Sequence, residues 1–178
     1  FFTNNMIRQY WEQGCHVVLV DIGDSYQGLY RMVQEESGGE DGVYYTYTEE
    51  SPLSFNPFYE ADYEYSEEKK DQLLSLIKIL WKGDEPLSNS ESTHVKVCIY
   101  NYLDRICADR SIRPCFDTFY QYLKEDYRLY ISEQLNVRID NFDVDDMIQV
   151  LEPFSSGGMF GHLLNSSDQL NLLEKRFI

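Results

Sequence analysis

The stretch FFTNNMIRQYWEQGCHVVLVDIGDSY, residues 1–26, decides the fold class. Residues 2–13 place their apolar side chains at helical spacing, and Gly14 follows them as a helix C-cap. Residues 16–21 then form a short apolar run, which is typical of a strand buried on both faces of a parallel sheet. Because the first helix opens at Phe1 without an N-cap, we expect further chain before it.

The helix–strand order repeats once more. Residues 25–36 have the pattern of a second helix, and the run VYYTYT at residues 43–48 is rich in strand-forming side chains. Alternation of helix and strand predicts an α/β fold whose sheet is parallel.

After Pro57 the pattern changes to helices alone. We expect helices at residues 66–82, 93–108, 117–135 and 143–152. Their start signals are a capping box of Ser88 with Glu91, and N-caps at Asp117 and Asp143. Residues 66–152 are therefore predicted to be a large all-helical insertion. The GGMFG loop and a short helix would return the chain to the sheet at its last residues, KRFI.

The composition limits the function classes. The chain has 178 residues, a net charge of −16 and an isoelectric point of about 4.4. Such a charge argues against direct binding of nucleic acid, which needs a basic face. No apolar run reaches the length of a membrane span. Four cysteines without C-x-x-C spacing fit a reducing cytoplasm better than a disulfide framework.

Two local motifs look functional but lack a required residue. The run GDSYQG at residues 23–28 has phosphate-loop spacing, but Leu29 and Tyr30 stand where Lys and Ser or Thr are needed. Residues 141–152 resemble a calcium loop, but Asp146 occupies the position of the obligatory glycine. We therefore expect a strand-to-helix turn at the first motif and a helix start at the second.

A structural zinc site is also disfavoured. His94 and Cys98 are four residues apart on one expected helix, but neither Cys107 nor Cys115 has a spacing that completes a ligand set. The sequence favours Cys98 as a small buried apolar side chain.

Three stretches together resemble the TraG family of conjugative-element ATPases, the large VirB-class motors of type IV secretion. They are residues 1–29, the run PLSFNPFY, and the closing LLNSSDQLNLLEKRFI; the run ADRSIRPCFDTFYQYL matches more loosely. The resemblance implies a P-loop-type parallel sheet of few strands, with residues 1–65 and 153–178 in the ATPase core and residues 66–152 as the helical insertion. It also implies that the chain lies between the Walker A and Walker B motifs and contains neither.

Site residues follow from this resemblance. Phe1 would lie where a backbone N–H contacts the α-phosphate of the nucleotide at a helix N-terminus. Asp21 would end a strand at the carboxyl edge of the sheet, where ligands bind in open sheets. We expect both only in the parent protein, and for Asp21 we favour a structural role, because the resemblance places its strand toward the sheet edge, away from the phosphates. Asn56-Pro57 matches a recurrent Asn-Pro of such motors, and we favour a turn role for it.

The resemblance implies a parent that hydrolyses ATP with Mg²⁺ to drive conjugative DNA transfer. Its expected partners are further copies of the ATPase, as a hexamer, and subunits of the secretion channel. Its expected location is cytoplasmic, at the inner face of the membrane. The 178 residues alone are expected to be inactive and to bind no cofactor. The alternative is an acidic binding module, such as a DNA mimic or a regulatory interaction domain.

Overall fold

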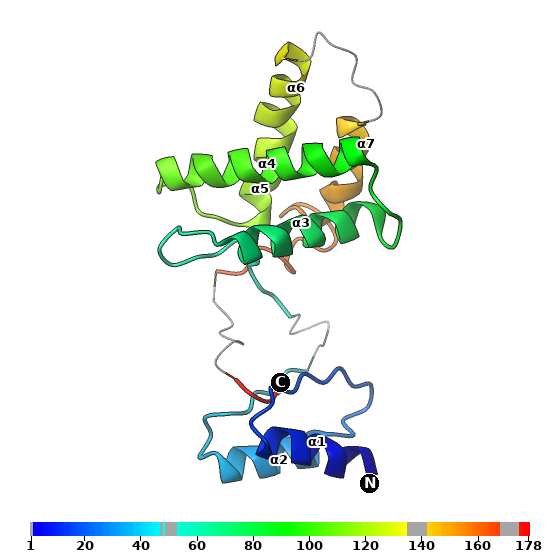
Figure 1. Cartoon of the computed structure of the whole chain (residues 1–178), viewed down its shortest axis with the longest axis vertical. Helices are drawn as coiled ribbons and strands as arrows, with labels where there is room; N and C mark the ends of the chain where they lie inside the picture. The colour runs from blue at the N-terminus through cyan, green and yellow to red at the C-terminus, as the bar shows by residue number, and fades with distance from the viewer. Residues whose placement is uncertain (1, 47, 49–52, 135–141, 168–174) are drawn as a thin grey trace. The chain divides into compact units, whose positions relative to one another are not determined.

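The chain folds into two compact units (Figure 1). The computed structural model describes residues 2–46, 48, 53–134, 142–167 and 175–178. The first unit, which we call the N-terminal unit, comprises Phe1–Leu53 and Leu170–Ile178. The second, the helical unit, comprises Ser54–Gln169. The expected division into an ATPase core and an insertion at residues 66–152 stays a prediction.

The N-terminal unit is built on two helices, α1 (Phe2–Glu12) and α2 (Gln27–Glu36). Both were predicted to within a few residues. Gly14 has a φ of +86°, which suits a residue without Cβ and ends the first helix as expected. The helices bury one small cluster with the C-terminal segment. Its members are Ile7, Trp11, Leu29, Val33 and Phe177.

The predicted P-loop-type parallel sheet is wrong for the described residues. Phe177 forms one isolated parallel bridge with Val17 and another with Gly42, and no strand is formed in the described part of the chain. The Val17 N–H donates to the Arg176 carbonyl at 2.7 Å, and the Val43 N–H donates to the Phe177 carbonyl at 2.9 Å. Three segments thus run side by side, but each pairing is too short to continue as a ladder.

The exposure of the apolar run explains why the strand prediction failed. Val18 is 67% exposed and Val20 is 96% exposed, whereas Val17 and Leu19 are partly buried. Only one face of the run is covered, so it does not have the two-sided burial that its composition suggested. The tyrosine-rich segment at residues 43–48 forms no strand either; residue 47 lies outside the described residues.

The helical unit consists of consecutive helices. They are α3 (Glu67–Lys82), α4 (Asn89–Ala108), α5 (Phe116–Tyr122), the π-helix η1 (Leu123–Tyr127), α6 (Arg128–Gln134), α7 (Val144–Leu151) and the 3₁₀-helix η2 (Glu152–Phe154). Helices α3 and α4 lie side by side, and α5, η1 and α6 continue as one column that crosses α4 (Figure 1).

Side-chain caps fix three of these helix starts. The Ser66 hydroxyl accepts the Lys69 N–H at 3.2 Å ahead of α3. Ser88 and Glu91 form the predicted capping box of α4. Asp143 accepts the Asp146 N–H at 2.9 Å, which confirms it as the N-cap of α7.

The expected N-cap at Asp117 is wrong. Cys115 is the N-cap residue of α5, and its N–H donates to the Thr118 hydroxyl at 3.2 Å. Asp117 lies inside the first turn and accepts the Ser156 N–H at 3.0 Å. A carboxylate is favourable in either position, so the sequence could not separate them.

The predicted long helix after residue 117 is interrupted by a π-turn. Leu123, Tyr127 and Ile131 are spaced by four residues, which is more than the 3.6 residues of an α-helical turn. The wider turn of η1 helps to keep all three in the core, where none is more than 2% exposed.

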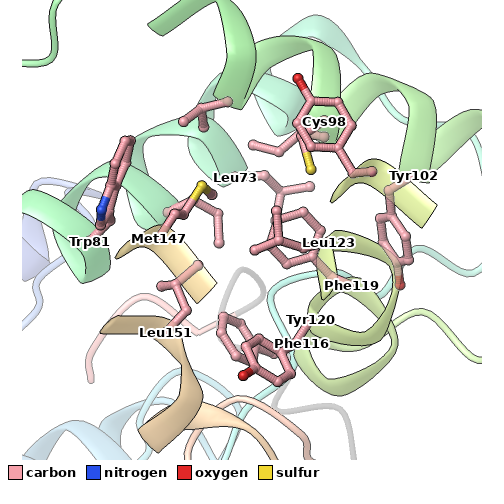
Figure 2. Close-up of a cluster of buried hydrophobic side chains, with 14 of the residues drawn as sticks. Leu73, Trp81, Cys98, Tyr102, Phe116, Phe119, Tyr120, Leu123, Met147 and Leu151 are labelled. Atoms are coloured by element: carbon pink, nitrogen blue, oxygen red, sulfur yellow. The ribbon is translucent and has the colours of Figure 1, made fainter. Parts of the chain in front are cut away.

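One large core holds the helical unit together. Figure 2 shows side chains from α3, α4, α5, η1 and α7 that point toward one another, among them Leu73, Tyr102, Phe119, Leu123 and Met147. Each of these five is at most 1% exposed. Aromatic pairs fill the centre: the rings of Phe58 and Phe119 stack at 5.3 Å. Such pairs add stabilisation beyond the buried area.

Candidate functional site

An apolar groove in the N-terminal unit is lined in part by Asp21, one of the two predicted site residues. It has a volume of about 330 Å³. Its walls come from the apolar run after α1, the start of α2, the tyrosine-rich segment and the C-terminus. The lining residues are Val18, Leu19, Val20, Asp21, Tyr26, Tyr44, Tyr45, Leu53, Phe177 and Ile178.

Tyrosines and the carboxylate of Asp21 line one side of this groove. The Tyr44 hydroxyl donates to Asp24 at 2.6 Å, and its ring packs on Tyr30 with 5.3 Å between the centroids. The hydrogen bond to Asp24 raises the pKa of Tyr44, and the neighbouring Asp21 acts in the same direction. The Asp24 backbone has a φ of +58°, a conformation that Asp tolerates better than most residues. This side of the groove therefore offers acceptors and aromatic faces to a ligand.

The structure places one of the two predicted site residues. Asp21 lines the groove, and its carboxylate accepts the Ser25 N–H at 2.5 Å. This contact fixes the turn that leads into α2, so it supplies a structural reason for an acid at this position. Phe1 lies outside the described residues. The nucleotide-binding role of both residues stays a prediction.

The groove does not suit a phosphate group. None of its lining residues is Lys, Arg or His. In the GDSYQG motif, Gly23 has a φ of +118° and Gly28 lies within α2. The motif is therefore a turn that leads into a helix, as expected, but the described residues before it form no strand. Without basic side chains, the lining of this groove does not fit the triphosphate of ATP by itself.

The calcium-like motif forms a helix start, as expected. Asp143 is the N-cap of α7, and Asp146 accepts the indole N–H of Trp81 at 2.8 Å. Within the described residues, no group of three or more His, Cys, Asp or Glu side chains has the geometry to hold a metal ion.

His94 and Cys98 do not form a ligand pair either. The His94 Nδ1 lies 3.1 Å from the Tyr127 hydroxyl, and burial lowers the pKa of this histidine. Cys98 is fully buried in the main core, and burial raises the pKa of its thiol. Both side chains are part of the packing of α4, as the sequence favoured for Cys98.

Asn56 has the turn role that the sequence favoured. Its Oδ1 accepts the Phe58 N–H at 3.1 Å, which closes an Asx-turn around Pro57. Its Nδ2 donates to the Pro114 carbonyl at 2.8 Å and ties this turn to the segment before α5.

Sequence reasoning missed the groove because it assigned the run at residues 43–48 to a strand. The alternation of Tyr and Thr in that run was a usable signal, since hydroxyl-bearing aromatic residues suit a surface that is half apolar. No helix in the described part of the chain is long and apolar enough to cross a membrane.

Comparison with protein-family models matches the chain to the TraG P-loop domain over residues 1–178. Comparisons with curated proteins and with solved structures gave no match. The family match includes all of the N-terminal unit and all of the helical unit. The chain therefore belongs to the TraG P-loop domain family.

Proposed function

We propose that the chain is part of an ATP-hydrolysing motor that drives conjugative DNA transfer through a type IV secretion channel. The observation that carries this proposal is the family match, which extends over residues 1–178 and so includes both units. The family's description as a P-loop domain implies nucleotide hydrolysis, and its relation to TraG implies conjugation.

Within this motor, the 178 residues would form the segment between the Walker A and Walker B motifs. Their sequence contains no G-x-x-x-x-G-K-S/T motif. The lining of the groove in the N-terminal unit also has no basic side chain that could pair with a phosphate. ATP and Mg²⁺ would thus be held by motif residues outside this segment, with Phe1 and Asp21 at the edge of the nucleotide site. On this basis the segment alone is catalytically silent.

The proposed partners are further copies of the motor, as a hexamer, and subunits of the secretion channel at the inner face of the membrane. The net charge of −16 supports contacts with protein over direct contacts with DNA. The helical unit, with its own core, is the proposed partner-binding part.

The test uses the complete reading frame that contains these residues. The purified full-length protein should hydrolyse ATP, and a donor strain that lacks the gene should lose conjugative transfer. Transfer should return with the wild-type gene but not with a gene whose Walker A lysine is replaced.

Two outcomes would overturn the proposal. Absence of ATPase activity in the folded full-length protein would exclude a motor. ATPase activity together with unimpaired transfer in the deletion strain would exclude a role in conjugation.

A further inference from the structure

The helical unit contains a basic surface cavity although the chain carries a net charge of −16. Its volume is about 270 Å³. Its walls come from the turn before α3, the loop between α4 and α5, and the segment that follows the GGMFG loop. The lining residues are Asn56, Tyr59, Tyr63, Arg110, Ser111, Arg113, Pro114, Ser166 and Ser167. Two are arginines and none is an acid, in a chain with 31 acidic and 15 basic residues.

Arg110 is held against an aromatic ring. Its guanidinium carbon lies 5.5 Å from the centroid of the Tyr63 ring, and the Tyr63 hydroxyl donates to the Arg110 carbonyl at 3.4 Å. Stacking on Tyr63 orients the guanidinium plane without using its N–H groups. No carboxylate of the described residues lies within ion-pair distance of Arg110.

Tyr63 is itself held in a strained backbone conformation. Its φ is +58°, which is unusual for a bulky residue. The Cys107 thiol contacts its carbonyl at 3.1 Å, and Arg110 covers its ring. Such strain persists only where the surroundings impose it, and it is common at binding sites.

Arg113 is fixed from the other side of the cavity. Its Nη2 donates to the carbonyl oxygens of Asn165, at 3.2 Å, and Ser166. A guanidinium has five N–H donors in a fixed fork. The described residues provide no acceptor for the Nε and Nη1 groups of Arg113, so these donors remain for a ligand.

The one acidic group in this loop is already engaged. Asp109 accepts both the N–H and the hydroxyl of Ser111, at 3.0 and 2.6 Å, and it does not line the cavity. These hydrogen bonds lower the pKa of Asp109 and satisfy its charge locally. The two arginines therefore dominate the charge of the cavity wall.

We propose that this cavity binds a small phosphorylated molecule, with its phosphate between Arg110 and Arg113 and its organic part against Tyr59 and Tyr63. Two guanidinium groups match the two charges of a phosphate monoester and can bind its oxygens through paired N–H groups. A single carboxylate would leave one of the two positive charges uncompensated.

Size and charge favour a small ligand over a polyanion. A volume of about 270 Å³ lies near the lower end for small-molecule pockets. A nucleic acid would bring many phosphates close to a chain of charge −16, whereas a small ligand brings charge to the cavity alone. This inference does not depend on the proposed motor function, because no residue of the cavity belongs to a nucleotide-hydrolysis motif.

Calorimetry with the 178-residue chain tests the site. The probes are phenyl phosphate, inorganic phosphate, and phenol, which has the ring but no phosphate. Phenyl phosphate should bind saturably at one site, inorganic phosphate more weakly, and phenol not measurably. Phenol binding equal to that of phenyl phosphate would overturn the proposal, as would the absence of saturable binding by both phosphates.

Three variants locate the binding. Arg110→Gln and Arg113→Gln should each weaken phenyl phosphate binding about tenfold or more, which corresponds to about 1.4 kcal/mol. Arg128→Gln removes the same charge from α6 and should leave the affinity unchanged. Wild-type affinity in both cavity variants would overturn the assignment.

Two further measurements separate the remaining explanations. Arg113 also supports two carbonyl oxygens, so circular dichroism must show a folded variant; if it unfolds, Arg110→Gln alone decides, since Arg110 makes no such contact. The second measurement is the binding of a single-stranded oligothymidine. If the oligothymidine binds in a way that requires Arg110 and phenyl phosphate does not bind, the ligand of the cavity is a nucleic acid and the proposal is contradicted.

Discussion

Trp81 of α3 donates its indole N–H to the carboxylate of Asp146 in α7 over 2.8 Å, although the two residues are 65 positions apart. Trp81 is only 6% exposed, and its ring packs edge-on against Phe142. Asp146 also stands in the first turn of α7, where an acid is favourable. One carboxylate thus joins two helices and completes the hydrogen bonding of a buried indole.

Replacing Asp146 by Ala should destabilise the helical unit. The indole N–H of Trp81 would remain buried without an acceptor, which costs about 1–3 kcal/mol. The free energy of unfolding, measured by urea denaturation with circular dichroism, should fall by this amount. Asp146→Asn keeps an acceptor and should cost less.

Asp145→Ala is the matched control, because it also removes an acid from the first turn of α7. Asp145 pairs with Arg128, and both side chains are more than half exposed, so this pair contributes at most about 1 kcal/mol. Equal losses for the two alanine variants would show that the contact with Trp81 contributes nothing.

The helix boundaries were largely predictable because their signals are local. Ser66, Ser88 and Asp143 each satisfy a backbone N–H only three residues away, so the cap and its partner lie in one short stretch of sequence. The Cys115 start of α5 was missed because its partner is a threonine hydroxyl, and Asp117 nearby was an equally good acid for a cap.

The arrangement of the N-terminal unit was not predictable in the same way. Arg176 binds Asp41 from 135 residues away, and the parallel bridges of Phe177 to Val17 and Gly42 likewise join segments that are far apart in the sequence. The burial of an apolar run such as residues 16–21 depends on what covers it, which its own sequence does not encode. The basic cavity was also missed. Its signal was the run RSIR at residues 110–113, two arginines close together in a chain poor in bases.

Removing the cap of α4 should cost about 1 kcal/mol of stability in the variant Ser88→Ala, because the Glu91 N–H loses its acceptor. Urea denaturation of the helical unit measures the loss. Ser90→Ala changes a serine in the same turn that does not cap the helix and should be close to neutral. A neutral Ser88→Ala would contradict the capping role.

The ion pair of Asp41 with Arg176 should make the N-terminal unit sensitive to acid. Arg176 Nε donates to the Asp41 carboxylate at 3.0 Å, and this hydrogen bond lowers the pKa of Asp41 below its ordinary value of 3.8. As the pH falls, the carboxyl group of the unfolded chain binds a proton first. The contribution to stability is therefore complete above the ordinary pKa and is lost as the pH falls through the lowered one.

Asp41→Asn tests this pair. Because both side chains are partly exposed, the variant should lose at most about 1 kcal/mol at pH 7. The difference in stability between the variant and wild type should shrink at strongly acidic pH. Thermal melts of both proteins at pH 7 and at strongly acidic pH would show this. Glu36→Gln removes an acid that pairs with Arg8 at the surface and serves as the control. A constant difference between Asp41→Asn and wild type at all pH values would contradict the linkage.

His94 should give the helical unit a second pH dependence, in a higher range. Its ring stacks on Phe142 with 4.4 Å between centroids, and burial lowers its pKa from the ordinary value of 6.5. Below pH 6.5 the histidine of the unfolded chain is protonated while the folded one stays neutral. The contribution of the buried, neutral His94 to the free energy of unfolding should therefore be complete above this pH. It should fall as the pH drops toward the pKa of His94 in the folded chain.

The variant His94→Phe should remove this dependence. A phenylalanine can keep the stacking on Phe142, and the Tyr127 hydroxyl keeps its bond to the backbone carbonyl of residue 94, at 2.9 Å. The slope of stability against pH just below 6.5 should be smaller in this variant than in wild type, whereas the exposed His162→Gln should leave it unchanged. NMR titration of the His94 ring gives the direct measurement. A folded-state pKa at or above 6.5 would show that burial does not control this histidine, and the predicted slope would then have another source.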